Sequence, residues 1–345
     1  MNVILSLTIS SLAIFGLVVI PFLGVWVAHL NVLFGIVIPY IAVIIFFLGM
    51  IYRVVKWAKS PVPFRIPTTC SQQKSLPWIK YTYVDKLDNP STRLGVWGRM
   101  ILEIFFFRSL FRNSRMQFGT GQDVRYTSSK WLWIGAMAFH YCFLVVIIRH
   151  LRFFTQSNPW FVTLTENIDG FFEMFVPAVY QSGLLLGAAL TFLLLRRLLS
   201  PQLRYISLPA DYFPLFLILT IAGTGILMRY GLKTDIVGVK ELTMGLANFN
   251  PTIPEGVGVL FYIHLFLVSI LFAYFPFSKL THMGGVFLSP TRNLENNNRA
   301  VRHINPWNPE VKLHTYEEYE DDYRDKMIGA GLPVDKQPAP KEEKE

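Results

Sequence analysis

The sequence predicts an all-α integral membrane protein built as a six-helix transmembrane bundle, with a cytoplasmic loop and a C-terminal tail. Its 345 residues are 52% hydrophobic and only 16% charged, which is too little charge for a soluble domain and too much hydrophobicity for disorder. No Asp, Glu, Lys or Arg precedes Arg53. Two pairs of histidines lie in or beside apolar segments, where an ionisable side chain is costly and therefore indicates function.

The charge and the cysteine count narrow the functional classes. The net charge is +9, but the basic residues border apolar segments, as the positive-inside rule requires. We therefore expect no nucleic-acid binding. The two cysteines, Cys70 and Cys142, provide no disulfide framework, and the chain has no C-x-x-C-H motif for covalent haem attachment.

Residues 1–52 predict two N-terminal transmembrane helices. A bilayer core takes about 20 residues of helix, and this uncharged run is long enough for two spans. The first, at 3–28, has no basic residue ahead of it, so we interpret it as a retained helix and not a cleaved signal peptide. The break falls near 29–33, which favours an interfacial role for His29 over a haem-ligand role.

Residues 53–130 predict a basic cytoplasmic loop. The segment holds fourteen Lys or Arg against four Asp or Glu, and the positive-inside rule places it in the cytoplasm. Within it, residues 99–115 combine phenylalanines with Arg108, Arg112 and Arg115 at helical spacing, which predicts a helix lying in the headgroup region. Packing of this helix against a partner subunit is the alternative.

Residues 131–285 predict a four-helix core, with spans at 131–148, 173–195, 212–228 and 256–278. The basic cluster at 196–204 and Lys279 mark cytoplasmic ends. The spans then alternate in direction. We expect a multi-pass protein of the cytoplasmic membrane with both termini in the cytoplasm. The tail at 286–345 is polar and charged, and its last stretch predicts disorder or ordering by a partner.

Four histidines lie in or beside these spans as two pairs of different spacing. On a helix rising about 1.5 Å per residue, His140 and His150 are about 15 Å apart, and His264 and His282 are about 27 Å apart. Antiparallel spans would pair His150 with His264 near the outer face and His140 with His282 near the inner face. The unequal separations require tilt or a break in the sixth helix, which Pro276 can supply.

Each histidine pair can hold one haem iron by both axial positions, which is electron-transfer chemistry. We therefore expect a bundle holding two b haems. Arg149, Arg152 and Arg229 lie at the depth of the outer pair, where haem propionates need cationic partners. For Arg149 and Arg152, snorkelling at the membrane interface is an equal alternative. The alternative for all four histidines is hydrogen bonding between helices or a proton path.

These features resemble the two-haem membrane cytochrome b subunits typified by the gamma subunit of respiratory nitrate reductase, with the membrane subunit of methanogen heterodisulfide reductase as a relative. The matching features are His-x9-His at 140 and 150, His-x17-His within HLFLVSILFAYFPFSKLTH (264–282), and RRLLSPQLR (196–204). The resemblance covers about residues 36–285.

The basic loop resembles a narrower group. Its segments IPTTCSQQKSLPWIK (66–80), LDNP (87–90) and GRMILEIFFFRSLFRNSR (98–115) are similar to the DsrM family. Members of that family are the cytochrome b subunits of DsrMKJOP complexes in sulfate-reducing and sulfur-oxidising prokaryotes. The long loop and the extra first helix depart from the nitrate reductase pattern.

The resemblance implies that menaquinol is oxidised in the membrane and that electrons cross two haems to a cytoplasmic iron-sulfur subunit similar to heterodisulfide reductase. The complex would have further membrane and periplasmic subunits. The nitrate reductase relatives use a lysine to help bind quinone, whereas this sequence offers Glu166, Asp169 and Glu173. We hypothesise that Glu173 accepts a quinol proton, with an ordinary interfacial carboxylate as the alternative. For Cys70, we favour an inert thiol over a redox role beside the cytoplasmic iron-sulfur subunit.

Other functions stay open at this point. Electron flow toward quinone, or membership of another nitrate reductase gamma-type or heterodisulfide reductase complex, fits the same residues. A transporter or proton channel would need polar residues along a pore, and the predicted spans are nearly bare of Asp, Glu, Asn and Lys. A membrane scaffold would bind partners through the basic loop and the tail. His303 and His314, in the tail, have no assigned role.

Overall fold

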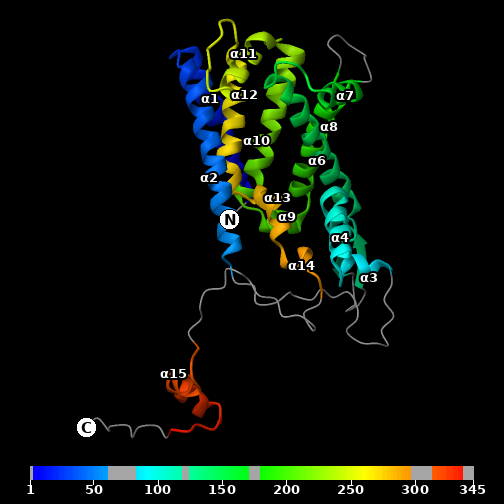
Figure 1. Cartoon of the computed structure of the whole chain (residues 1–345), viewed down its shortest axis with the longest axis vertical. Helices are drawn as coiled ribbons and strands as arrows, with labels where there is room; N and C mark the ends of the chain where they lie inside the picture. Colours follow the sequence, from blue (N-terminus) through cyan, green and yellow to red (C-terminus); the bar gives the residue numbers. More distant parts are fainter. Residues whose placement is uncertain (1–2, 61–82, 119–123, 171–178, 297–312, 337–345) are drawn as a thin grey trace, which may run out of the picture.

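The computed structural model describes residues 3–60, 83–118, 124–170, 179–296 and 313–336. Within these ranges, six helical segments are long and apolar enough to cross a membrane, which confirms the all-α membrane bundle (Figure 1). The segments are Val3–Trp26, Leu33–Ala58, Lys130–Phe153, Gln181–Leu199, Pro209–Gly231 and Val259–Phe277.

The six segments contain five uninterrupted α-helices and a sixth that opens with a π-helical turn. They are α1 (Val3–Trp26), η1 and α2 (Leu33–Val37 and Ile38–Ala58), α6 (Lys130–His150), α8 (Gln181–Leu199), α10 (Pro209–Ile226) and α12 (Val259–Tyr274). Short turns extend three of them, namely η2 (Leu151–Phe153), η3 (Leu227–Gly231) and η4 (Phe275–Phe277). Helix α12 packs against α1, α2 and α10, whereas α6 packs against α8.

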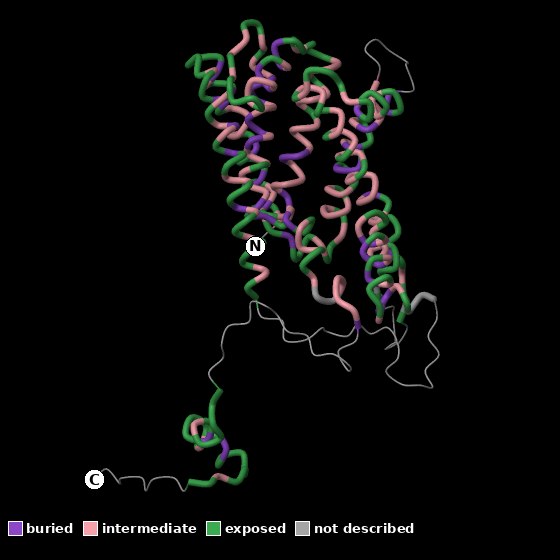
Figure 2. The backbone as a smooth tube through the Cα atoms, in the orientation of Figure 1, coloured by how far each residue is buried: buried purple, intermediate pink, exposed green. Residues whose placement is uncertain are grey.

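The outer surface of the bundle is apolar. On α1, Ile4 and Phe15 are 70% and 67% exposed, and Figure 2 shows exposed residues around the outside of the bundle and buried ones toward its middle. Large exposed apolar area on a soluble protein would cause aggregation, but in a bilayer the hydrocarbon chains cover it. The chain is therefore a multi-pass membrane protein.

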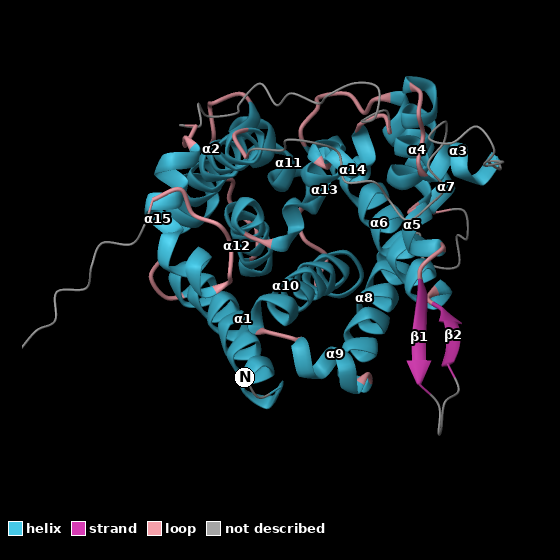
Figure 3. Cartoon of the chain, turned by 90° about the horizontal axis from the view of Figure 1, so that it is seen from below, coloured by secondary structure: helices cyan, strands magenta, loops and turns pink. Residues whose placement is uncertain are grey.

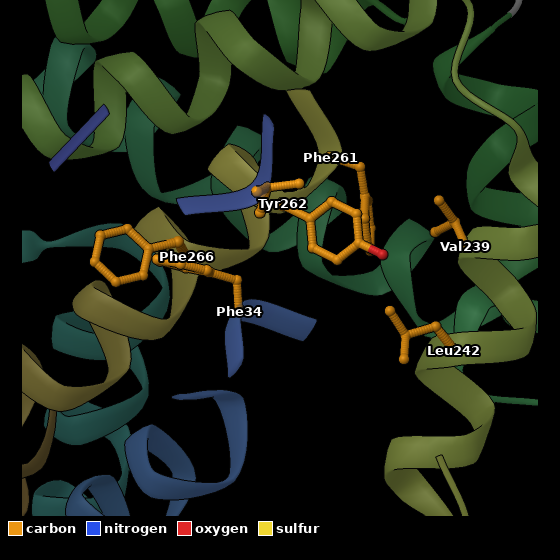
Figure 4. Close-up of a cluster of buried hydrophobic side chains, with 7 residues drawn as sticks. Phe34, Val239, Leu242, Phe261, Tyr262 and Phe266 are labelled. Atoms are coloured by element: carbon orange, nitrogen blue, oxygen red, sulfur yellow. The ribbon is translucent and has the colours of Figure 1, made fainter. Parts of the chain in front are cut away.

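A buried aromatic cluster fixes α12 against the N-terminal helices. Phe34 meets Phe266 edge to face, with ring centres 5.5 Å apart, and Tyr262 is almost fully buried beside them (Figure 4). Leu242 and Val239 close the cluster from α11 (Ile236–Ala247). Aromatic pairs in this arrangement contribute about 1 kcal/mol each beyond their buried area.

Several helix boundaries differ from the prediction. Helix α2 runs on through Ala58, past the predicted end at residue 52, because Arg53 donates from Nε to the Pro276 carbonyl oxygen (3.0 Å) and so finds a partner within the bundle. The helix of the fourth span begins at Gln181, because Tyr180 before it has an extended backbone, and the predicted start at 173 lies outside the described residues. That span ends at Leu199, not at 195, since Arg196 and Arg197 can extend their cations toward water from its last turn.

The predicted headgroup helix at 99–115 is wrong as a single helix. The loop contains two short helices and one of middle length, followed by a hairpin: α3 (Tyr83–Asp88), α4 (Arg93–Phe106), α5 (Arg108–Phe111), β1 (Ser114–Phe118) and β2 (Val124–Ser128). The helix stops because Phe107 adopts a left-handed backbone conformation. The antiparallel strands pair Ser114 with Ser128, and Figure 3 shows them at the periphery of the helices.

Short helices complete the connections and the C-terminal part. They are α7 (Trp160–Asp169), α9 (Pro201–Ile206), α13 (His282–Gly285), α14 (Pro290–Asn293) and α15 (Tyr316–Gly329), with turns η5 (Lys279–Thr281) and η6 (Val286–Leu288). Helix α15 was not predicted from composition. It begins with a capping box of Thr315 and Glu318, and the backbone amides of Asp335 and Lys336 donate to Glu320, which holds the pKa of that carboxyl below its usual range.

Candidate functional site

The structure brings the four histidines together in the two expected pairs. The ring centres of His140 and His282 are 6.0 Å apart, with ring planes at 89°. Those of His150 and His264 are 6.5 Å apart, with planes at 15°. We refer to these as the 140/282 pair and the 150/264 pair. Each pair joins α6 to α12 or to the segment that follows α12.

The position of His282 depends on a break in the sixth span. Helix α12 ends at Tyr274, and Pro276 lies in the tight turn η4 that follows. The break packs on α2, where a Cβ at Gly49 would lie 2.7 Å from the Pro276 side chain. Together with the Arg53 hydrogen bond, this contact holds the turn in place, so that His282 starts a new short helix instead of continuing the old one. The predicted role of Pro276 is confirmed.

Each imidazole is oriented by a hydrogen bond at Nδ1. The Nδ1 of His140 lies 2.8 Å from the Ala136 carbonyl oxygen, that of His150 lies 2.7 Å from Val146 O, and that of His282 lies 2.9 Å from Lys279 O. A carbonyl oxygen can only accept, so Nδ1 carries the proton and Nε2 keeps its lone pair. This is the arrangement that orients a histidine as a metal ligand through Nε2.

His264 reaches the same state through a side chain. Its Nδ1 lies 2.8 Å from Thr224 Oγ1. The Thr224 hydroxyl also contacts the carbonyl oxygens of Thr220 and Ile221, both at 2.9 Å. Because the single hydroxyl proton is donated to a carbonyl, Oγ1 accepts from His264 Nδ1–H, and Nε2 is again the ligand nitrogen. Sequence reasoning did not find this contact, because nothing in the spacing of the histidines points to Thr224.

Both pairs fit a haem iron bound by two imidazoles. A metal–imidazole bond is about 2.0 Å, and the centre of a five-membered ring with bonds of about 1.33 Å lies about 1.1 Å from its atoms. Two imidazoles on opposite sides of one iron therefore have centres about 6 Å apart. The four residues that would hold two haems are thus in place. Helix α6 carries one histidine of each pair. Even so, Gly135 is the single buried residue of that helix.

The predicted cationic residues lie beside the 150/264 pair, but they already have partners. Arg149 forms a 2.9 Å ion pair with Asp169, and its guanidinium lies 3.7 Å from the centre of the Tyr180 ring. The Arg229 guanidinium lies 4.0 Å from the centre of the same ring. Arg152 forms a 2.9 Å ion pair with Glu166. Binding of haem propionates by these arginines stays a prediction.

Asp169 is the centre of a buried polar network that sequence reasoning did not find. Besides pairing with Arg149, it accepts from the backbone amide and the hydroxyl of Ser182, both at 2.7 Å. Ser182 Oγ in turn accepts from Arg149 Nη2 at 3.1 Å. The network joins the end of α6, the end of α7 and the start of α8. Glu166 and Asp169, offered above as quinone contacts, therefore have structural partners.

The remaining singled-out residues lie outside these pairs. His29 has φ 53° in the connection between α1 and η1, and His314 lies 3.8 Å from Glu318. Cys70, Glu173 and His303 fall outside the described residues. In the part of the chain that the structure describes, no three His, Cys, Asp or Glu side chains gather as a metal cluster.

The fold and the paired histidines define a helical membrane protein with two candidate cofactor sites between its spans. Comparison with known proteins agrees. Residues 96–303 match the model of the nitrate reductase gamma subunit family. An Archaeoglobus fulgidus protein named Hdr-like menaquinol oxidoreductase cytochrome b-like subunit is 50% identical over 284 residues, 81% of this chain and 85% of that protein.

Two further relatives extend the comparison. The protein of the same name from Archaeoglobus profundus is 44% identical over 78% of this chain and 80% of its own length. The nitrate reductase gamma chain of Bacillus subtilis is 26% identical over 58% of this chain and 93% of its own length. The chain belongs to the nitrate reductase gamma subunit family, and close homologues within it are Hdr-like menaquinol oxidoreductase cytochrome b-like subunits. The family predicted from the histidine spacing is confirmed.

Proposed function

We propose that this chain is a membrane cytochrome b subunit of a menaquinol oxidoreductase complex, with two haem b groups held by the 140/282 and 150/264 pairs. The observation that carries the proposal is the presence of two histidine pairs whose ring centres are 6.0 and 6.5 Å apart. The names of the Archaeoglobus relatives support menaquinol as the substrate. Bound haem would supply reversible one-electron chemistry at each pair.

The chain's own residues would bind and orient the two groups. His140 and His150 are ten residues apart on one uninterrupted helix, which separates the two sites by about 15 Å along the axis of that helix. Their Nδ1 hydrogen bonds fix the ligand tautomers, and a haem held by both histidines of a pair would have no site left open for oxygen. A subunit of this design conducts electrons between the two faces of the membrane.

Within such a complex, we infer that electrons pass from menaquinol to a cytoplasmic iron-sulfur subunit like that of heterodisulfide reductase, in sulfur metabolism of the DsrM type. Further membrane and periplasmic subunits would complete the assembly. The basic residues at 53–130 and 196–204 support a location in the cytoplasmic membrane with both termini in the cytoplasm.

The reduced-minus-oxidised absorbance spectrum of the purified chain tests the proposal. We expect b-type bands and two haems per chain by extraction and quantification of the haem. A chain that binds no haem under conditions in which it is folded would contradict the proposal and would leave a membrane anchor or a transporter as the function.

We further propose that Glu173 accepts a proton from menaquinol. We expect Glu173→Gln to slow menaquinol-driven haem reduction at least tenfold while dithionite still reduces both haems, because the amide cannot take up a proton. Glu255→Gln, in another connection of the chain, is the matched control and should reduce at the wild-type rate. An unchanged rate in Glu173→Gln would remove the residue from the mechanism.

A further inference from the structure

Phe107 has an unusual backbone conformation at the turn between α4 and α5. Its φ of 48° and ψ of 46° place it in the left-handed region, which residues with a bulky side chain rarely adopt and which glycine adopts freely. A large side chain in such a strained conformation is a reason to search for a function of that side chain.

The turn is held on both sides by hydrogen bonds. Phe107 donates its backbone N–H to Leu102 O, and Ser109 bonds the buried Glu103 carboxylate through both its amide and its hydroxyl. From α6, Trp133 Nε1 donates to Phe106 O at 2.7 Å, and Tyr141 Oη donates to Phe105 O at 2.8 Å. The surroundings therefore fix the backbone of the turn against the face of α6 that carries His140.

The side chain of Phe107 meets the His140 ring. The two ring centres are 4.9 Å apart and the planes are at 83°. Phe139 meets the same imidazole with centres 4.8 Å apart and planes at 79°. With the Ala136 hydrogen bond at Nδ1, three contacts restrict rotation of this ring. Its plane stands at 89° to that of His282, whereas the planes of the 150/264 pair are at 15°.

We propose that Phe107 is a positioning residue that holds the His140 ring perpendicular to the His282 ring and thereby sets the electronic character of the haem at that pair. The inference rests on the proposed function. Parallel imidazole planes donate unequally to the two iron orbitals of π symmetry, whereas perpendicular planes donate equally. The 140/282 pair should therefore give a ferric low-spin signal with a larger maximum g value than the 150/264 pair.

Phe107→Gly removes the side chain and keeps the left-handed backbone conformation. Glycine keeps the N–H bond to Leu102 and adopts the left-handed region without strain, so the turn should remain folded, but the contact with His140 is lost. We expect the large-g signal of the purified, haem-loaded protein to move to lower g and to broaden. The midpoint potential of the same haem should also shift, while the other haem keeps both its signal and its potential.

Two variants control the experiment. Phe22→Ala removes a phenylalanine of α1 that packs on Trp26, with ring centres 5.4 Å apart, and should leave both signals unchanged. Phe107→Tyr restores an aromatic ring and should restore the large-g signal. Wild-type signals and potentials in Phe107→Gly would overturn the proposal, as would equal changes at both haems. Absence of haem from the wild-type 140/282 pair would instead refute the proposed function.

Discussion

On the proposed function, we expect His264→Ala to remove one of the two haems and leave the other. The imidazole is held by Thr224 and pairs with His150 across 6.5 Å, so its loss would leave one haem with a single histidine to hold it. We expect the haem content of the purified chain to fall by about half. His282→Ala should remove the other haem, and the two single variants should retain different halves of the wild-type difference spectrum and of the potentiometric titration.

Double variants test the pairing itself. His150→Ala with His264→Ala should lose no more haem than either change alone, because both ligands serve one iron. His140→Ala with His264→Ala should lose both haems. His314→Ala, outside the bundle, is the control and should retain two. Loss of both haems from the 150/264 double variant, in a chain that still folds, would contradict the assignment of ligands to pairs.

Asp169→Ala will destabilise the end of the bundle near the 150/264 pair. The side chains of Arg149 and Asp169 are 11% and 6% exposed, and breaking a buried ion pair by removing one partner typically costs about 3 kcal/mol, because it leaves an uncompensated charge. Ser182 also loses the acceptor for its amide and its hydroxyl. Unfolding of the purified protein by SDS in mixed micelles measures the loss.

Glu241→Ala provides the matched control for Asp169→Ala. Glu241, on α11, accepts a hydrogen bond of 2.9 Å from Thr252, and both residues are exposed. Removing the Glu241 carboxylate should therefore lower the free energy of unfolding by less than about 1 kcal/mol. Removing Arg149 together with Asp169 should cost less than the sum of the two single changes, because the double variant buries no unpaired charge. Equal effects of Asp169→Ala and Glu241→Ala would show that the Arg149 network does not stabilise the bundle.

The sequence contains most of the information about the spans and the histidine pairs. Six apolar runs and the positions of basic residues locate the helices. The hydrocarbon core offers no partner for backbone polar groups, so an apolar run that crosses it must form a helix. The intervals of ten and eighteen residues determine which histidines can meet across antiparallel helices. Even the break in the sixth span follows from the mismatch of these intervals and from Pro276.

The rest depends on contacts between segments distant in the sequence. Nothing local to Phe107 predicts a left-handed turn, because bonds from Trp133 and Tyr141 help to hold it. The end of α2 depends on Arg53 reaching Pro276, more than two hundred residues away. Asp169 and Ser182 become partners once α7 and α8 meet beside Arg149. These pairings are tertiary, and no helical or strand periodicity encodes them.

The break at Pro276 also gives the two pairs different local stabilities. His264 lies within the long helix α12, and His150 is the last residue of the long helix α6. His282 lies on a four-residue helix between two short 3₁₀ turns, whose hydrogen bonds have poorer geometry. Segments of this kind open at a lower free energy than the core of a domain. The 140/282 pair can therefore separate while all six spans stay inserted, so its site would be the last to close during assembly.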